Sequence, residues 1–228
     1  MIALVLSLSL VAGMGQLMGS TGRAGRGESA QTQAQETGRL AVEMLGRELR
    51  KAGYRTDRQQ SLDQLFPAAA PFAAGAVVSG DNQSVTLRFL GSGDVWMRSC
   101  LGASVANAAM AVQTLSVVAG ELRCRARNLV TGVDSTLPLL SNVEAMDVSY
   151  GLDADGDGFA DSYALAATVT DWTHVASINI QLRTVASEAN VLAEPQPYVD
   201  VDGQLVTPTD RRLRRNFSVV IALRNRLP

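Results

Sequence analysis

Hydrophobic positions divide the chain into a helical beginning and a β-rich remainder. Residues 1–18 are almost all apolar, and the first charged residue is Arg23. In residues 40–52, apolar side chains recur at three- and four-residue spacing, which is the period of one helix face. No proline occurs before Pro67, so the pattern predicts one nearly continuous helix that ends near residue 52.

Alternation of apolar and polar residues takes over in the rest of the chain and predicts strands at 84–90, 143–150, 177–185 and 213–223. This alternation is typical of antiparallel strands with one covered face, and the amphipathic end of the helix is suited to cover it. We therefore expect an α+β fold, with one long N-terminal helix packed on an antiparallel β-sheet. Residues 60–76 are predicted to form a loop, and 188–210 a long excursion with a hairpin around Asp202 and Gly203.

Length and composition fit one good-sized domain with an extension, or two small domains. The chain has 228 residues, of which 46% are hydrophobic and 18% charged, as in globular proteins. We expect a transmembrane helix half at 1–22, an amphipathic helix half at 23–53 and a globular β-rich domain at 54–228. The net charge of −2 argues against nucleic acid as the main partner, and we interpret the arginines within 211–215 as a solvated face or as packing partners.

The apolar start is interpreted as a membrane anchor. As a helix, residues 1–18 would be roughly 27 Å long, close to the hydrocarbon thickness of a bilayer. A cleaved signal peptide would need a basic region that is missing here, and a buried core helix of this length would have a polar face. The candidate membrane and assembly residues are Leu4, Leu6, Leu8, Leu10, Gly15 and Gly19, of which the two glycines form a GxxxG helix-packing pattern.

Two cysteines, Cys100 and Cys124, follow strand-like runs, and a disulfide between neighbouring strands is expected if the domain is exported. Two buried free thiols are the alternative, whereas a zinc site would have only His174 to add as a ligand. Export conflicts with Arg23 and Arg26, which by the positive-inside rule place the downstream chain in the cytoplasm. Either a signal upstream sets the orientation, or two arginines are too few to decide it.

The most explicit chemistry lies in residues 151–163, GLDADGDGFADSY. Five residues match the first, third, fifth, seventh and ninth positions of an EF-hand-type calcium loop. They are Asp153, Asp155, Asp157, Phe159 (backbone) and Asp161, where Phe159 offers its carbonyl oxygen and the others their carboxylates. Alternate carboxylates in a tight turn converge on one point, and glycine supplies the bend. We therefore expect a structural Ca²⁺ ion here.

The twelfth position of this loop is Ala164, where an EF-hand has a bidentate glutamate. A carboxylate from elsewhere or water must complete the site, and the candidates are Asp147, Glu144 and Asp171. The alternative interpretation is a solvated acidic turn between two strands.

Catalytic motifs are absent from the sequence. There is no GxSxG, Walker A or HExxH pattern, and His174 has no motif around it. The aspartates alone would be an incomplete magnesium site for phosphoryl chemistry, so we expect no enzymatic activity.

Three blocks of the sequence carry a family resemblance. The start IALVLSLSLVAG, running into ETGRLAVEMLGRELRKAGY, resembles the N-terminal helix of the type IV pilin superfamily. The end RRLRRNFSVVIALRNRLP is similar to the C-terminal strand of the PilW family, and YGLDADGDGFADSY followed by Trp172 also looks like this family. The resemblance implies a pilin-like fold and a non-catalytic minor pilin that takes part in type IV pilus assembly, in a priming or tip complex.

This resemblance also implies partners and a location. The implied partners are other minor pilins, with the major pilin and a PilY-type tip adhesin as further candidates. The implied location is the bacterial inner membrane with a periplasmic domain, and the pilus after assembly, with a role in twitching motility. The family's basic leader, glycine, aromatic residue and glutamate have no counterpart before Met1, so we expect the chain to start just inside the mature helix.

Two alternatives remain open. A J-type pseudopilin of type II secretion shares the fold, and a membrane-anchored, calcium-stabilised periplasmic binding module would never enter a filament. The upstream DNA discriminates between a pilin and such a module, because an in-frame leader with glycine, aromatic residue and glutamate is expected only for the pilin superfamily.

Overall fold

The computed structural model describes residues 2–94, 97–127, 132–200 and 203–226, and the side chains of the first helix from Gly25 onward. The chain forms two compact units. The larger unit comprises Thr37–Thr184 and Asn216–Pro228, and the smaller unit comprises Met1–Glu36 and Val185–Arg215.

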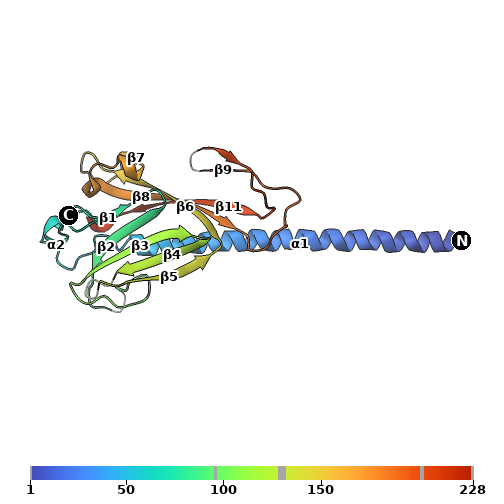
Figure 1. The fold of residues 1–228 in the computed structure, drawn as a ribbon, viewed down its shortest axis with the longest axis horizontal. Coiled ribbons are helices and arrows are strands. Elements are labelled where there is room, and N and C mark those ends of the chain that lie inside the picture. Colours follow the sequence, from blue (N-terminus) through green and yellow to red (C-terminus); the bar gives the residue numbers. More distant parts are fainter. Residues whose placement is uncertain (1, 95–96, 128–131, 201–202, 227–228) are drawn as a thin grey trace. The chain divides into compact units, whose positions relative to one another are not determined.

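The fold is α+β, with one long helix followed by strands (Figure 1). Helix α1 is Ile2–Leu49, slightly shorter than predicted. The strands are β1 (Val78–Gly80), β2 (Ser84–Leu90), β3 (Met110–Val118), β4 (Glu121–Arg127), β5 (Asp134–Ser141), β6 (Val143–Leu152), β7 (Ser162–Ala164), β8 (Val175–Val185), β9 (Tyr198–Val199), β10 (Leu205–Val206) and β11 (Arg214–Ala222). The short helices are α2 (Leu62–Leu65), η1 (Ala166–Thr168), η2 (Trp172–His174) and η3 (Arg224–Arg226).

The predicted membrane anchor, residues 1–22, lies outside the residues whose side chains are described. The same holds for the candidate residues Leu4, Leu6, Leu8, Leu10, Gly15 and Gly19. Within the described part of the chain, no helix combines the length and apolar character that a membrane crossing requires. The anchor therefore stays a prediction from the sequence.

The strands form two main sheets, where the sequence had predicted one. A five-stranded sheet has the order β1-β2-β3-β4-β5, and each pair of neighbours is antiparallel. A four-stranded sheet has the order β11-β8-β6-β7, in which β6 pairs antiparallel with both β8 and β7. Figure 1 shows the first sheet in green and yellow-green and the second in yellow to red.

Sequence alternation missed β3 and β5, and the structure shows why. In β3, one face carries Ala111, Gln113 and Leu115 against the core, while Met110 and Val112 occupy the other face, so apolar residues appear on both sides. β5 is the edge strand of its sheet, is largely exposed and contains Pro138, which is tolerated at an edge. Neither strand therefore has the simple period of two.

The end of α1 is the helical face of the larger unit's core, as predicted. Ala41, Leu45 and Leu49 have no exposed surface and share one hydrophobic cluster with Leu87 and Phe89 of β2. Burial of each leucine or phenylalanine side chain stabilises a fold by roughly 1.5–3 kcal/mol, before the cost of ordering the chain.

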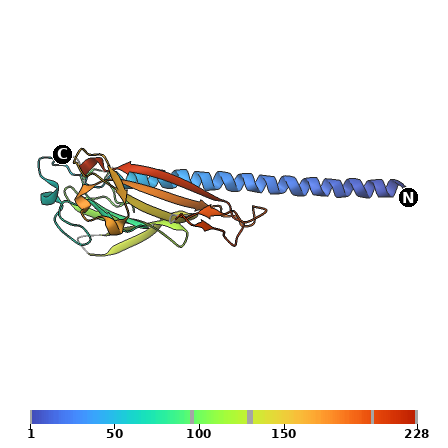
Figure 2. The same ribbon diagram turned by 90° about the horizontal axis from the view of Figure 1, so that it is seen from above.

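Close packing against β11 explains why α1 contains a glycine at position 38. Glycine in a helix interior costs about 1 kcal/mol relative to alanine. At Gly38, a Cβ atom would collide with the ring of Phe217, so only glycine fits under this ring. Figure 2 shows β11, in red, running alongside the helix.

A buried polar network joins the last turn of α1 to β3. Glu48 is only 3% exposed, and its carboxylate accepts hydrogen bonds from Lys51 at 2.7 Å and from the Gln113 side chain at 2.8 Å. Gln113 in turn accepts from the backbone N–H of Cys100 at 2.9 Å. A buried carboxylate is tolerated only when it is paired and hydrogen-bonded, so this network selects the helix rotation that places Glu48 opposite Gln113.

Arg88 of β2 pins the loop that precedes β1. Its side chain has no exposed surface, and its nitrogens donate at 2.6–3.0 Å to four backbone oxygens, those of Ala76, Pro67, Phe66 and Ala73. The guanidinium also lies over the ring of Phe72, 4.6 Å from its centroid. Burial lowers the pKa of Arg88 to about 10, so the group keeps its charge at neutral pH.

The two cysteines form a disulfide, as expected. Cys124 lies on β4 and is fully buried, whereas Cys100 lies in the loop between β2 and β3. The expectation of a link between neighbouring strands was therefore wrong in this detail. The bond ties a long connection to the sheet, with 24 residues of sequence separation and a Cα–Cα distance of 6.3 Å.

The smaller unit has a core of its own. Ala30 and Ala34 of α1 form a cluster with Ala186 and Leu213. β9 and β10 form the hairpin predicted within 188–210, with Gly203 at a φ of +74° in the turn. Asp202, the other residue of the predicted turn, lies outside the described residues.

Replacing Arg88 by methionine is expected to lower the unfolding free energy by about 3–5 kcal/mol, because four buried carbonyls lose their donors. Denaturant unfolding followed by circular dichroism measures this loss. Arg123→Met is the matched control, since Arg123 lies on the same sheet and pairs with Glu121 at the surface. The control should change stability by less than about 1 kcal/mol. Equal losses in both variants would contradict the pinning role.

Replacing both Cys100 and Cys124 by serine is expected to cost about 3 kcal/mol, because the unfolded chain regains the entropy that the closed loop had removed. Intact mass with and without reductant should differ by two protons. Two thiols that react with an alkylating agent in denatured, unreduced protein would show that the disulfide does not form.

Candidate metal centre

The candidate metal centre is the loop of residues 153–161, which joins β6 to β7. The two strands pair from Leu152 with Ser162, and the Asp161 N–H donates to the Leu152 carbonyl at 2.8 Å. The loop thus starts and ends at one point of the four-stranded sheet, where alternate aspartates are held in a tight turn.

Asp153 organises the loop from within. It is 1% exposed, and its carboxylate accepts hydrogen bonds from the backbone N–H groups of Gly156 at 2.7 Å and Gly158 at 3.1 Å. Arg226 donates to the same carboxylate at 2.9 Å. The two glycines have φ values of +82° and +91°, which a residue with a side chain rarely adopts, so glycine is required for this wrapping.

The pKa of Asp153 is held below its ordinary value. Desolvation acts in the opposite direction, but the hydrogen bond from Arg226 and those from Gly156 and Gly158 outweigh it, and the charge of Arg226 adds to them. Asp153 is therefore ionised at neutral pH, as a metal ligand must be.

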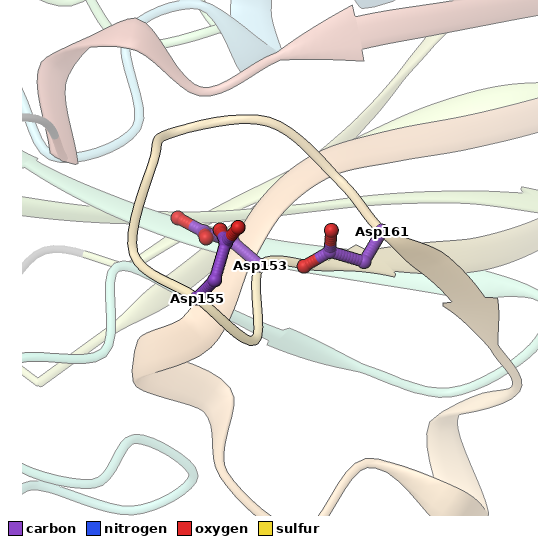
Figure 3. A group of neighbouring side chains, drawn as sticks. All are labelled: Asp153, Asp155 and Asp161. Atoms are coloured by element: carbon purple, nitrogen blue, oxygen red, sulfur yellow. The ribbon is translucent and has the colours of Figure 1, made fainter.

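Three carboxylates converge in this loop. Oxygens of Asp153, Asp155 and Asp161 lie within 4.8 Å of one another. Figure 3 shows the carboxylates of Asp153 and Asp155 side by side, with the side chain of Asp161 directed towards them. Asp161 also accepts from the Ala154 N–H at 2.7 Å, which holds the end of the loop against its beginning.

The other predicted ligands are placed differently. Asp157 is not part of the converging group, and its carboxylate accepts from the Phe159 N–H at 2.8 Å. The side chain of Phe159 is 76% exposed, which is compatible with a role of its backbone alone. Among the predicted completing ligands, Glu144 pairs with Arg183 at 3.0 Å, and Asp171 accepts from Thr173 at the start of η2.

The donor set fits a hard divalent cation. It consists of oxygen atoms only, it carries three negative charges, and one member is buried and preorganised. Arg226 is the residue that sequence reasoning missed. It lies 73 positions from Asp153 and has no local motif, so no signal in the sequence pointed to it.

The fold around this loop is that of type IV-like pilins. A type IV-like pilin from Thermus thermophilus superimposes with a TM-score of 0.51 at 18% identity, covering 85% of this chain and 96% of the other. The GspK–GspI–GspJ complex of the type 2 secretion system of enterotoxigenic Escherichia coli also matches, with a TM-score of 0.36 at 11% identity, covering 81% of this chain and 96% of that one.

The family assignment comes from the sequence. Residues 109–225, just over half of the chain, match the family described as Type IV Pilus-assembly protein W, PilW, and the chain belongs to this family. A search of curated proteins gives no match. The matched range contains the aspartate loop, Cys124 and all of β11, so the predicted family resemblance is confirmed. A pilin-type role in assembly follows, and proteins of this fold and family are typically structural rather than catalytic.

Proposed function

We propose that this protein is a minor pilin that joins other minor pilins in the complex that primes, or caps, a type IV pilus. The observation that carries the proposal is the PilW match over residues 109–225 on a pilin-like fold. Pilus assembly requires a subunit that presents one helix for bundling and one folded domain for lateral contacts, and this chain has both kinds of element.

The proposed location is the inner membrane and the periplasm. The apolar residues 1–22 serve as an anchor in the inner membrane, and the folded part lies in the periplasm. A disulfide between Cys100 and Cys124 supports export, because disulfides persist in oxidising compartments and are rare in the cytosol. After assembly the protein is part of the pilus.

The partners are other minor pilins, with the major pilin and a PilY-type tip adhesin as further contacts. Membrane helices associate through close packing at small residues, and the sequence places Gly15 and Gly19 one turn apart in the apolar segment. These two glycines are therefore the proposed helix-packing face.

A clean deletion of the gene is expected to reduce surface pili and twitching, and the chain supplied in trans should restore both. Gly19→Leu should fail to restore them and should lower co-purification with other minor pilins, because a bulky residue separates the packed helices. Gly25→Leu is the control in the same helix, since a Cβ atom there meets nothing within 4 Å.

Normal piliation in the deletion strain would refute the assembly role. A defect in type II secretion with normal pili would point to a J-type pseudopilin. Normal pili together with normal secretion would leave the membrane-anchored binding module.

We further propose that the 153–161 loop binds one structural Ca²⁺ ion. The converging oxygens of Asp153, Asp155 and Asp161 support this, because three carboxylates at this spacing repel one another unless a cation lies between them. Arg226 offsets part of the repulsion at Asp153 alone. Calcium would close the loop and thereby hold β7 against β6.

Calcium at millimolar concentration is expected to raise the melting temperature, and EDTA to lower it, since a ligand that binds the folded state stabilises it by mass action. We expect a dissociation constant of roughly 10⁻⁵ to 10⁻³ M, because the twelfth-position glutamate of an EF-hand is replaced by Ala164. Asp155→Asn and Asp161→Asn should each abolish the shift.

Controls separate the ligands from their neighbours. Asp94→Asn removes an exposed carboxylate outside the loop and should leave the calcium effect intact. Asp157→Asn tests whether Asp157 is a ligand. An intact calcium effect in this variant supports the set Asp153, Asp155 and Asp161, and a lost effect supports the full EF-hand order, which includes Asp157. If calorimetric titration with millimolar calcium shows no binding heat, the loop binds no calcium and its aspartates form only a charged turn.

A further inference from the structure

The outer face of the five-stranded sheet carries a cavity of about 220 Å³. The loop that precedes β1 forms one wall, and strands β2, β3 and β4 with the start of β5 form the floor. Its polar lining residues are Arg88, Arg125, Arg127, Thr86, Thr114 and Asp134. The cavity lies within the larger unit, and neither the aspartate loop nor the disulfide contributes to its lining.

Strand register explains why these side chains meet. One cross-strand row contains Thr86, Thr114 and Arg125, and the next contains Arg88, Val112, Arg127 and Asp134. Residues in such rows project from the same face of a sheet. The hydroxyls of Thr86 and Thr114 lie 2.9 Å apart and form a polar centre between the two rows.

Positive charge exceeds negative charge around this cavity. Among the residues that the structure describes, Arg125 and Arg127 pair with one carboxylate, that of Asp134, at 3.8 Å and 3.6 Å. Arg88 has no exposed surface, and within the described part of the chain it contacts backbone oxygens and aromatic rings rather than a carboxylate. Three positively charged side chains therefore line the cavity with one negatively charged side chain, and this excess of positive charge favours the binding of an anion.

The remaining lining is apolar. Pro71, Phe72, Met110 and Val112 contribute hydrocarbon and ring surface beside the arginines. An inorganic anion would leave this surface without a partner, whereas a molecule with both a charged and an apolar part would cover it.

From this arrangement we propose that the cavity binds an organic carboxylate, held by Arg125 and Arg127 and packed against Pro71 and Phe72. Guanidinium groups match the planar carboxylate with parallel N–H donors. The carboxylate is either a small free acid or the side chain of a glutamate in a peptide segment, since both have the same recognised group.

The three arginines have different tasks in this site. Arg125 and Arg127 have side chains that are 56% and 53% exposed, so they contact the ligand directly. The Nε and both Nη atoms of Arg88 donate hydrogen bonds to the loop that precedes β1, so they are not available to a ligand. Arg88 instead contributes a fixed positive charge at the floor of the cavity and holds the loop that forms its wall. It is a positioning residue.

The test uses the full-length chain in detergent micelles and titrates it with butyrate, with butyramide as the uncharged match. Arginine Nε–Hε resonances report on the contact, and calorimetry reports the affinity. Butyrate is expected to shift the resonances of Arg125 and Arg127, and butyramide to leave them in place. Equal response to acid and amide would overturn the proposal, as would no response to butyrate.

Variants give the second arm. Arg125→Gln and Arg127→Gln should each weaken butyrate binding about tenfold, the loss expected for one charge-assisted hydrogen bond. Asp134→Asn should strengthen binding, because it removes the carboxylate that pairs with both arginines. Arg123→Gln is the matched control, since Arg123 lies on the same face of β4, pairs with Glu121 and does not line the cavity. Unchanged affinity in the first two variants would refute the site.

A third arm distinguishes the two sources of the carboxylate. A blocked peptide containing Leu-Glu is compared with one containing Leu-Gln. Tighter binding of the glutamate peptide than of butyrate supports a protein segment as ligand, and the reverse order supports a free acid. Absence of binding by both carboxylates would overturn the proposal.

Discussion

The larger unit depends on the burial of one charge at the end of α1. Leu45 and Leu49 make this helix face apolar, but apolar contacts alone permit several rotations and translations of a helix on a sheet. Glu48 removes this freedom, because its carboxylate is almost fully buried and one of its hydrogen bonds comes from Gln113 on the sheet, beside those from Lys51 and Arg47 of the helix end. Gln113 also accepts a hydrogen bond from the backbone N–H of Cys100, so this network connects the helix, the sheet and the disulfide-bonded loop.

Long connections of this fold are held by specific bonds rather than by a larger core. Arg88 ties the loop before β1 to the sheet through backbone oxygens, and the disulfide ties the loop before β3 to β4. Both bonds lie within this chain, so neither depends on a partner subunit. The loop that Arg88 holds also forms one wall of the cavity on the outer face of the five-stranded sheet.

Part of the candidate metal centre was predictable. Alternate aspartates with intervening glycines converge in any chain that turns here, so Asp153, Asp155 and Asp161 were found from spacing alone. The ion pair of Asp153 with Arg226 was not predictable, because it depends on where η3 lies relative to the loop. Spacing alone also did not separate Asp157, whose carboxylate accepts from the Phe159 N–H, from the three converging aspartates. Local spacing selects candidate ligands, and tertiary packing selects among them.

The sequence by itself determined the long helix, its amphipathic end, the alternating strands β2, β6, β8 and β11, and the family, since each is written in local periodicity or in contiguous blocks. Only the tertiary structure decided that the strands form two sheets, that β3 and β5 exist, and that Cys100 lies in a loop. The reason is physical: β3 has apolar residues on both faces and β5 is an exposed edge with a proline, so neither carries a period of its own. These strands are defined by their hydrogen bonds with β2 and β4, and the apolar–polar pattern within one segment does not encode such bonds.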